Sequence, residues 1–321
     1  MHPRRTALGL LAAPFLAPRA RAQAPFPNRP LRLIVTYPPG GVTDIVGRLC
    51  ADAMGPKLGQ PVVVENRAGA GGNIGVQAAA AAEPDGHTLL LGTAATHGVN
   101  PVLYAGSGVD AVRDFDAVGT AGDMPNVLSV NPKRLDVGSV AELVAAGRRG
   151  GLVYGSVGNG SSSHLSATVF LRAAGFEATH VPYRGSSPAV AALLAGEFDF
   201  LFDTTATSTA QVRAGAFRAL AVTSARRSSA LPEVPTMQEA GFAGYDLSVW
   251  MGPFVSKRAP PPVLARLQEA FGQAMDGAVQ AKLRNAFVDP LTVPPAELPR
   301  WVAAEAECWN RLARDARLAV D

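Results

Sequence analysis

Cysteine is scarce in this chain. Its 321 residues include only two, Cys50 and Cys308, and they stand far apart. No close pair of cysteine or histidine ligands has the spacing that structural zinc sites use, so a zinc-stabilised fold is not expected. The two thiols could pair in an oxidising compartment, although two separate buried thiols are the simpler prediction.

The chain also lacks an excess of basic residues once its first segment is set aside. It has 29 Lys and Arg against 26 Asp and Glu, but four of the arginines lie before residue 25. Without that segment, 25 basic side chains balance 26 acidic ones, a formal charge near −1. No stripe of Lys and Arg with interleaved aromatics remains, so nucleic acid is not an expected partner.

Long apolar runs are absent as well. The run over 7–17 is too short to cross a bilayer, and it lies between the pair Arg4-Arg5 and the small-residue segment 20–24. This order predicts a secretory signal peptide over 1–24, cleaved after Ala22 or Ala24. A Sec signal is the first interpretation, and Arg4-Arg5 also fits a twin-arginine signal. We therefore expect a soluble, exported protein in the periplasm.

The remaining chain alternates between short apolar runs and helical patterns. About 297 residues remain after the leader, which exceeds the usual size of a single core. An α/β protein with parallel sheets covered on both faces is predicted, in two lobes joined by two crossings. We place lobe 1 at 25–124 and 226–321, and lobe 2 at 125–225. The predicted strands are 31–35, 62–65, 88–92, 117–120, 126–130, 152–155, 179–183, 198–202, 219–223 and 245–250. The predicted helices are 44–58, 73–82, 140–148, 162–174, 188–195, 262–275, 279–287 and 296–318.

The loop after the first predicted strand has the features of a small-anion site. Glycines allow a ligand to approach the backbone, and a helix start presents unpaired amides with a partial positive charge. A simple tight turn is the alternative interpretation. Asp44 could orient a water, bind a ligand amine or cap the helix. The candidate ligand-binding residues of this loop are Tyr37, Pro39, Gly40, Gly41, Thr43 and Asp44.

A second loop of the same kind follows the predicted strand 152–155, in the other lobe. It carries glycines and then hydroxyls at a helix start, so two helix N-termini could hold one anion from both sides. Its candidate ligand-binding residues are Ser156, Gly158, Gly160, Ser161, Ser162 and His164. A nucleophile elbow would need glycine at 154, where tyrosine stands, so a serine hydrolase is not favoured.

Two other loops offer weaker signals. The segment 66–75 resembles a dinucleotide fingerprint but has Ile74 where the last glycine should be, so no nucleotide and no other cofactor is expected. Thr93 and Thr96 could bind a ligand carboxylate or cap the following helix. His97 is expected to be structural.

Two charged residues follow predicted strands of lobe 2. Arg184 could reach a carboxylate or tie down its own loop. Asp203 could orient a water, bind a ligand amine or cap the helix that follows. Met124, Pro125, Phe202 and Trp250 lie near the crossings, and core packing is expected for each.

Ordered motifs along nearly the whole mature chain resemble one known family, the periplasmic solute-binding receptors of tripartite tricarboxylate transporters, also called Bug-type receptors. They are Arg29 to Val35, Pro38 to Asp44, Val64 to Gly72, Pro84 to Leu90, His164-Leu165, Val181 to Gly185, Leu220 to Ser224, Leu231 to Thr236, and Glu239 to Gly241.

The resemblance implies a type II periplasmic-binding-protein fold with a ligand cleft between two lobes. It implies that the loops 38–44 and 156–163 hold a ligand carboxylate and that the lobes close around it. The ligand would be a di- or tricarboxylate, an acidic amino acid or an aromatic acid. Delivery would be to a membrane permease of one large and one small subunit, and the receptor is expected to be a monomer. Large receptor expansions in the family leave open whether this copy has a dedicated permease.

Three other functions remain open at this point. A ligand sensor for a membrane signalling partner would use the same site. A hydrolase or isomerase of a small acid would need a titrating base at His164 or Asp203. A transcriptional effector domain shares the fold class, but the leader and the lack of a helix-turn-helix segment argue against it.

Overall fold

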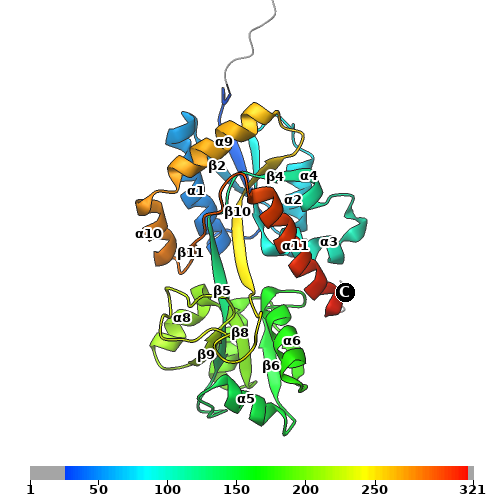
Figure 1. The fold of residues 1–321 in the computed structure, drawn as a ribbon, viewed down its shortest axis with the longest axis vertical. Coiled ribbons are helices and arrows are strands. Elements are labelled where there is room, and N and C mark those ends of the chain that lie inside the picture. Colours follow the sequence, from blue (N-terminus) through cyan, green and yellow to red (C-terminus); the bar gives the residue numbers. More distant parts are fainter. Residues whose placement is uncertain (1–25, 317–321) are drawn as a thin grey trace, which may run out of the picture.

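The structure is a computed structural model that describes residues 26–316 of the chain. The predicted signal peptide over 1–24 lies outside these residues. Two α/β lobes stand one above the other, and two long strands run between them (Figure 1).

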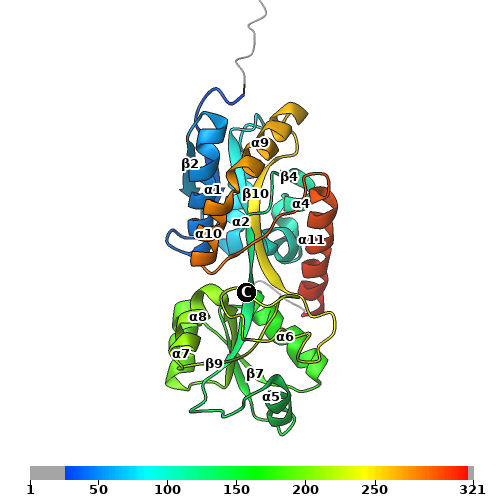
Figure 2. The ribbon, with the colours of Figure 1, turned by 60° about the vertical axis from the view of Figure 1, so that its left-hand side comes forward.

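Lobe 1 contains a sheet with helices on both faces. Figure 2 shows α1, α9 and α10 on one side and α11 on the other. Helix α2 shares an apolar cluster with α11, and a separate apolar cluster lies beneath α1, α9 and α10. The strands are β1 (Leu31–Val35), β2 (Val62–Asn66), β3 (Thr88–Thr93), β4 (Phe115–Ala117) and β11 (Asp289–Pro290). The helices are α1 (Val42–Leu58), α2 (Asn73–Ala80), α3 (Asn100–Leu103), α4 (Ala111–Asp114), α9 (Pro261–Ala274), α10 (Gly277–Asn285) and α11 (Leu298–Asp315), with short turns η1 (Ala70–Gly72), η2 (Ala95–Val99) and η3 (Ala105–Ser107).

Lobe 2 repeats this layering on a smaller scale. Helices α5 and α6 share one apolar cluster with the sheet, and α7 packs on the opposite face. The strands are β6 (Val153–Ser156), β7 (Thr179–Pro182), β8 (Phe200–Thr204) and β9 (Arg218–Val222), and the helices are α5 (Val140–Gly147), α6 (Ser162–Ala174), α7 (Ser186–Ala195) and α8 (Thr205–Arg213).

The crossing strands β5 (Gly122–Val130) and β10 (Ser248–Ser256) make the sheet mixed rather than parallel. The strand order is β2-β1-β3-β10-β5-β8-β6-β7. Pairs within each lobe, such as β1 with β3 and β6 with β8, are parallel as predicted. The pairs β10 with β3, β10 with β5 and β5 with β8 are antiparallel, because both crossing strands connect one lobe to the other.

Residues that follow β9 stay in contact with the second lobe as far as the start of β10. Val222 N–H donates to Pro235 O at 2.8 Å, and Leu247 N–H donates to Thr223 O at 2.9 Å. The lobe boundaries remain a proposal, and these contacts favour placing the second crossing at β10 rather than at residue 226.

Apolar packing accounts for the aromatic and sulfur-containing residues near the crossings. Met124, Phe202 and Trp250 are all buried in the core. Cys50 is a buried free thiol, and burial raises its pKa to about 12. Cys308 is half-buried and also free, so the two cysteines do not pair.

Candidate functional site

The register of the crossing strands places both candidate loops at the boundary between the lobes. Thr93, at the end of β3, pairs with Met251 near the start of β10. Asn126 of β5 pairs with Thr204 at the end of β8. Because β1 is parallel to β3 and β6 is parallel to β8, the loops after β1 and β6 lie at these same ends. Helices α1 and α6 therefore begin at opposite sides of one interlobe boundary (Figure 1).

Asp44 organises the loop between β1 and α1. The residue is 4% exposed, and its carboxylate accepts hydrogen bonds from Gly40 N–H (3.0 Å), Arg48 Nε (3.0 Å) and Asn66 Nδ2 (2.9 Å). Burial alone would raise the pKa of Asp44, but these donors together hold it below its usual value. Asn66, which the sequence did not mark as a site residue, also donates to Tyr37 O at 3.0 Å.

The first turn of α1 keeps its amides available. Gly41 is the N-cap and provides no side-chain cap, and the first helical bond runs from Ile45 N–H to Gly41 O at 3.0 Å. The amides of Val42 and Thr43 therefore have no intrahelical acceptor. Pro39, Gly40 and Gly41 are exposed beside them, so a ligand can reach this part of the loop.

The side chains of Tyr37, Thr93 and Thr96 behind this loop are already bonded. Tyr37 Oη donates to Gly71 O at 3.4 Å, and burial raises its pKa. Thr93 N–H donates to Thr96 Oγ1 (2.9 Å), Thr96 N–H donates to Thr93 Oγ1 (3.2 Å), and both side chains are buried. These bonds favour a structural role for the two threonines over contact with a ligand.

The loop after β6 is held by its own side chains. Ser161 is the N-cap of α6, accepts from His164 N–H at 3.2 Å and donates to Gly158 O at 2.6 Å. Gly158 N–H donates to Ser156 Oγ at 3.2 Å, and Gly160 N–H donates to His164 Nδ1 at 3.2 Å. The amides of Gly158 and Gly160 therefore already have acceptors within the loop and the start of α6.

The groups that this loop leaves for a ligand are at the start of α6. Ser162 is half-buried, and its hydroxyl has no partner within 26–316. The amides of Ser162 and Ser163 occupy the first helical turn and have no intrahelical acceptor. The donors that this loop leaves without an acceptor are thus these two amides and the Ser162 hydroxyl, although Ser163 itself is buried.

His180 is a site neighbour that the sequence analysis did not mark. Its Nε2 is 2.6 Å from Ser156 Oγ. The pairing of Tyr154 with His180 between β6 and β7 places both side chains on the face that also carries Ser156, two residues further along β6. Ser156 is fully buried, which does not suit a nucleophile. The alternating direction of the side chains along Thr179-His180-Val181 was the available signal in the sequence. Placing His180 beside Ser156 also required the register between β6 and β7, which are distant in sequence.

Arg184 and Asp203 are both near the start of α7, Arg184 two residues before it in sequence and Asp203 bonded to its first residue, Ser186. Arg184 is exposed and makes no hydrogen bond or ion pair with any residue that the structure describes. Its neighbour Tyr183 donates its amide to Ser156 O at 2.9 Å, so Arg184 is adjacent to the lobe 2 loop. Asp203 is 1% exposed and accepts from Ser186 Oγ (3.0 Å) and Thr204 N–H (2.8 Å). Burial raises the pKa of Asp203 to about 6.

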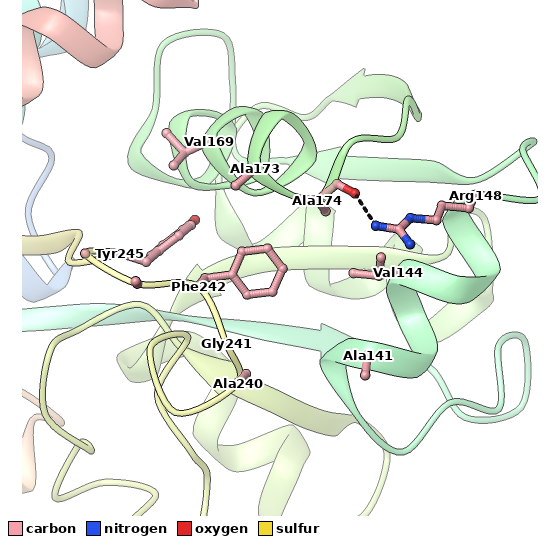
Figure 3. Close-up of a pocket in the computed structure, with 12 residues that line it drawn as sticks. Ala141, Val144, Arg148, Val169, Ala173, Ala174, Ala240, Gly241, Phe242 and Tyr245 are labelled. Atoms are coloured by element: carbon pink, nitrogen blue, oxygen red, sulfur yellow. Dashed lines mark hydrogen bonds between the residues drawn. The ribbon is translucent and has the colours of Figure 1, made fainter.

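A separate cavity of about 650 Å³ lies elsewhere on lobe 2. Figure 3 shows it between α5, α6 and the segment 240–245, with Phe242 and Val144 in its wall. Arg148 donates to Ala174 O at 3.3 Å there. Neither candidate loop lines this cavity, so it does not belong to the interlobe site.

Residues 26–316 were found to hold neither a metal-binding cluster nor a helix suited to a membrane crossing. No cluster of three or more His, Cys, Asp or Glu side chains within 26–316 is arranged to hold a metal ion. Over the same part of the chain, no helix combines the length and apolar character that a bilayer crossing requires.

Comparison with known proteins identifies the family. The model described as tripartite tricarboxylate transporter family receptor (TctC) matches residues 46–318. A UPF0065 protein of Pseudomonas sp. is 37% identical over 320 residues, covering 98% of this chain and 95% of its own. Protein BugT of Bordetella pertussis is 35% identical over 294 residues, covering 90% of both chains.

Solved structures agree with this assignment. R. palustris Rpa4515, determined with adipate, superposes with a TM-score of 0.79 at 33% identity and covers 92% of this chain and 100% of its own. MatC from Rhodopseudomonas palustris, with bound malate, has a TM-score of 0.76 at 30% identity, covering 90% and 100%. The chain is therefore a member of the tripartite tricarboxylate transporter receptor family and has its two-lobed binding-protein fold. The receptors of this family are periplasmic solute-binding proteins of tripartite transporters.

Proposed function

We propose that this receptor captures a small carboxylate between its lobes, holding it with the N-termini of α1 and α6. The observation that carries the proposal is the placement of both helix starts at one boundary, each with amides that no helical acceptor uses. Each helix N-terminus contributes about 0.3–1 kcal/mol of charge–dipole attraction when exposed, and more when water is excluded.

The donor set suits reversible capture. Neutral amides and hydroxyls stabilise a carboxylate without leaving an uncompensated buried charge when the ligand departs. The proposed contacts are Gly41, Val42 and Thr43 in lobe 1 and Ser162 and Ser163 in lobe 2, with Arg184 available at the rim, because the amide of Gly40 is already bonded to Asp44. A ligand that binds both lobes stabilises the closed state only through its higher affinity for that state.

Adipate and malate define the first ligands to test, because relatives at 33% and 30% identity were solved with them. We further propose that the protein is exported to the periplasm as a monomer, has no enzymatic activity, and delivers its ligand to a membrane permease. Size-exclusion chromatography with light scattering tests the monomer.

The direct experiment is native mass spectrometry of gently purified protein, followed by denaturing release of whatever is bound. A released small carboxylic acid would support the proposal. A bound nucleotide, or conversion of an added acid into another compound, would contradict it. If the protein is empty, titration calorimetry with adipate and malate at neutral pH decides the question, and a thermal-shift panel of other carboxylates extends the search.

A further inference from the structure

A column of stacked rings supports the anion-binding loop of lobe 2. The imidazoles of His164 and His180 stack with centroids 4.2 Å apart and planes 8° from parallel. His180 stacks in turn on Tyr154 at 4.7 Å, and Tyr154 on Phe200 at 5.5 Å. Tyr154 and Phe200 are buried in the core, so the column links the core to the loop.

Each imidazole of the column holds a different point of the loop. His164 Nδ1 accepts the amide of Gly160 at 3.2 Å. His180 Nε2 lies 2.6 Å from Ser156 Oγ, whereas the alternative acceptor of that hydroxyl, Gly158 O, lies at 3.3 Å. Which of the two atoms donates in the contact between His180 Nε2 and Ser156 Oγ depends on the histidine tautomer, and in either arrangement the contact ties Ser156 to the ring. His164 Nδ1 therefore acts as an acceptor towards the loop, and an imidazole nitrogen accepts only while it is unprotonated.

We propose that His164 and His180 are positioning residues of the ligand site, which fix Gly160 and Ser156 so that the first turn of α6 presents its amides to the anion. The inference rests on the proposed function, because it gives the loop geometry a binding role. Neither histidine need touch the ligand.

The arrangement makes the loop dependent on pH. A protonated His164 would donate through Nδ1 and could no longer accept from Gly160. Burial and the neighbouring His180 lower the pKa of His164 to about 4, and burial lowers that of His180. The titratable groups that face the pair are the two histidines themselves, from α6 and β7, and Tyr154 from β6. The loop is thus expected to be intact at neutral pH and to loosen on acidification.

The test compares isosteric pairs of variants in the full mature protein. His164→Asn keeps an acceptor for Gly160, whereas His164→Leu removes it. His180→Gln keeps a polar partner for Ser156, whereas His180→Phe keeps only the ring stack. His87→Leu, which removes a buried imidazole in lobe 1, is the control. The readouts are hydrogen exchange of the Gly160 amide by NMR and calorimetric affinity for adipate and malate between pH 4 and pH 7.5.

We expect the Gly160 amide to exchange about tenfold faster in His164→Leu at pH 7 and at the wild-type rate in His164→Asn. Carboxylate affinity should fall about tenfold in His164→Leu and His180→Phe and recover in the polar variants. His164→Asn should bind with a flatter pH profile than the wild type. Unchanged Gly160 exchange in His164→Leu would overturn the inference. If Gly160 exchange rises in His164→Leu but the wild type binds no carboxylate, the positioning of the loop is supported and the proposed function is contradicted.

Discussion

The guanidinium group of Arg213 lies over the ring of Phe287, 5.6 Å from its centroid, and joins lobe 2 to lobe 1. Phe287 has a positive φ of 60°, which is an outlier for a bulky side chain. Its carbonyl accepts from Thr205 Oγ1 at 3.0 Å, and Ser228 Oγ donates to Asp289 Oδ2 at 2.9 Å close by. The segment between α10 and β11 is thus held in a strained conformation by contacts from the other lobe.

Arg213→Met should loosen this interlobe contact. A partly exposed cation–π pair contributes about 0.5–1 kcal/mol, which corresponds to a two- to fivefold change in the ratio of lobe arrangements. Spin labels on the two lobes would measure this as a broader distance distribution in the ligand-free protein. Arg149→Met, at an exposed arginine of lobe 2, is the matched control. An unchanged distribution in Arg213→Met would show that the pair does not restrain the lobes.

Gly41→Val tests the lobe 1 part of the ligand site. Gly41 has φ −78° and ψ 167°, a conformation open to any residue, and an added Cβ would meet only Pro38 O at 3.7 Å. The variant should fold with a stability loss below about 1 kcal/mol, while its side chain obstructs the exposed amides and weakens carboxylate binding at least tenfold. Gly106→Val, where an added Cβ meets nothing within 4 Å, is the control. Wild-type affinity in Gly41→Val would remove this loop from the site.

Asp44→Ala should affect both folding and binding. It removes the shared acceptor of Gly40, Arg48 and Asn66, and hydrogen bonds to a charged group contribute about 1.5–3 kcal/mol. Chemical denaturation and calorimetry would measure the two effects. Because the pKa of Asp44 is depressed, its contribution to stability is present above the unfolded value near 3.8 and is lost as the pH falls below it. The difference between Asp44→Ala and the wild type should therefore vanish only at strongly acidic pH.

Arg184→Gln should discriminate between ligands by their charge. Arg184 is exposed and makes no bond to the part of the chain that the structure describes, so its removal should leave stability within about 0.5 kcal/mol of the wild type. If it contacts the second carboxylate of a diacid, affinity for adipate should fall severalfold while affinity for a monoacid of equal length stays constant. Equal losses for both ligands would indicate that Arg184 shapes its loop instead.

Local sequence patterns predicted the elements whose ends are marked by local chemistry. The bounds of β1 and α6 are those predicted, because an apolar run and an N-cap serine mark them. The bounds of helix α8 could not be predicted from the sequence, since Thr205-Ala206-Thr207-Ser208-Thr209 has low helix propensity. Its threonine hydroxyls are bonded to the backbone instead, as in Thr209 Oγ1 to Thr205 O at 2.6 Å.

The same dependence on local sequence explains which parts of the candidate site could be predicted. The glycine and hydroxyl loops could be recognised because a strand end, a turn and a helix start follow one another in the sequence. Which of their donors are free could not be predicted, since Gly160 is bonded to a side chain in the next helix and Ser156 to a residue on another strand. The antiparallel crossings were missed for a related reason, because pairing partners of β5 and β10 are distant in sequence.

The final prediction concerns the stability of the fold in acid. His97 is fully buried, with its ring 4.1 Å from that of Phe254 and its Nδ1 3.0 Å from Thr96 Oγ1. Its Nε2 has no partner among residues 26–316. Burial lowers the pKa of His97 to about 4. His97 therefore becomes protonated near pH 6.5 in the unfolded chain but only near pH 4 in the folded chain. The free energy of unfolding falls as the pH falls through this window.

The full effect of His97 is about 3 kcal/mol, from about 1.4 kcal/mol for each unit of depressed pKa. His97→Leu should flatten the dependence of unfolding free energy on pH between 6.5 and 4, measured by urea denaturation at closely spaced pH values. The flattening will be partial, because burial also lowers the pKa of His164 to about 4. Phe254→Leu, which removes packing beside His97 without removing a titrating group, should lower stability by the same amount at every pH. Parallel curves of unfolding free energy against pH for His97→Leu and the wild type would show that the folded core accommodates the charged imidazole.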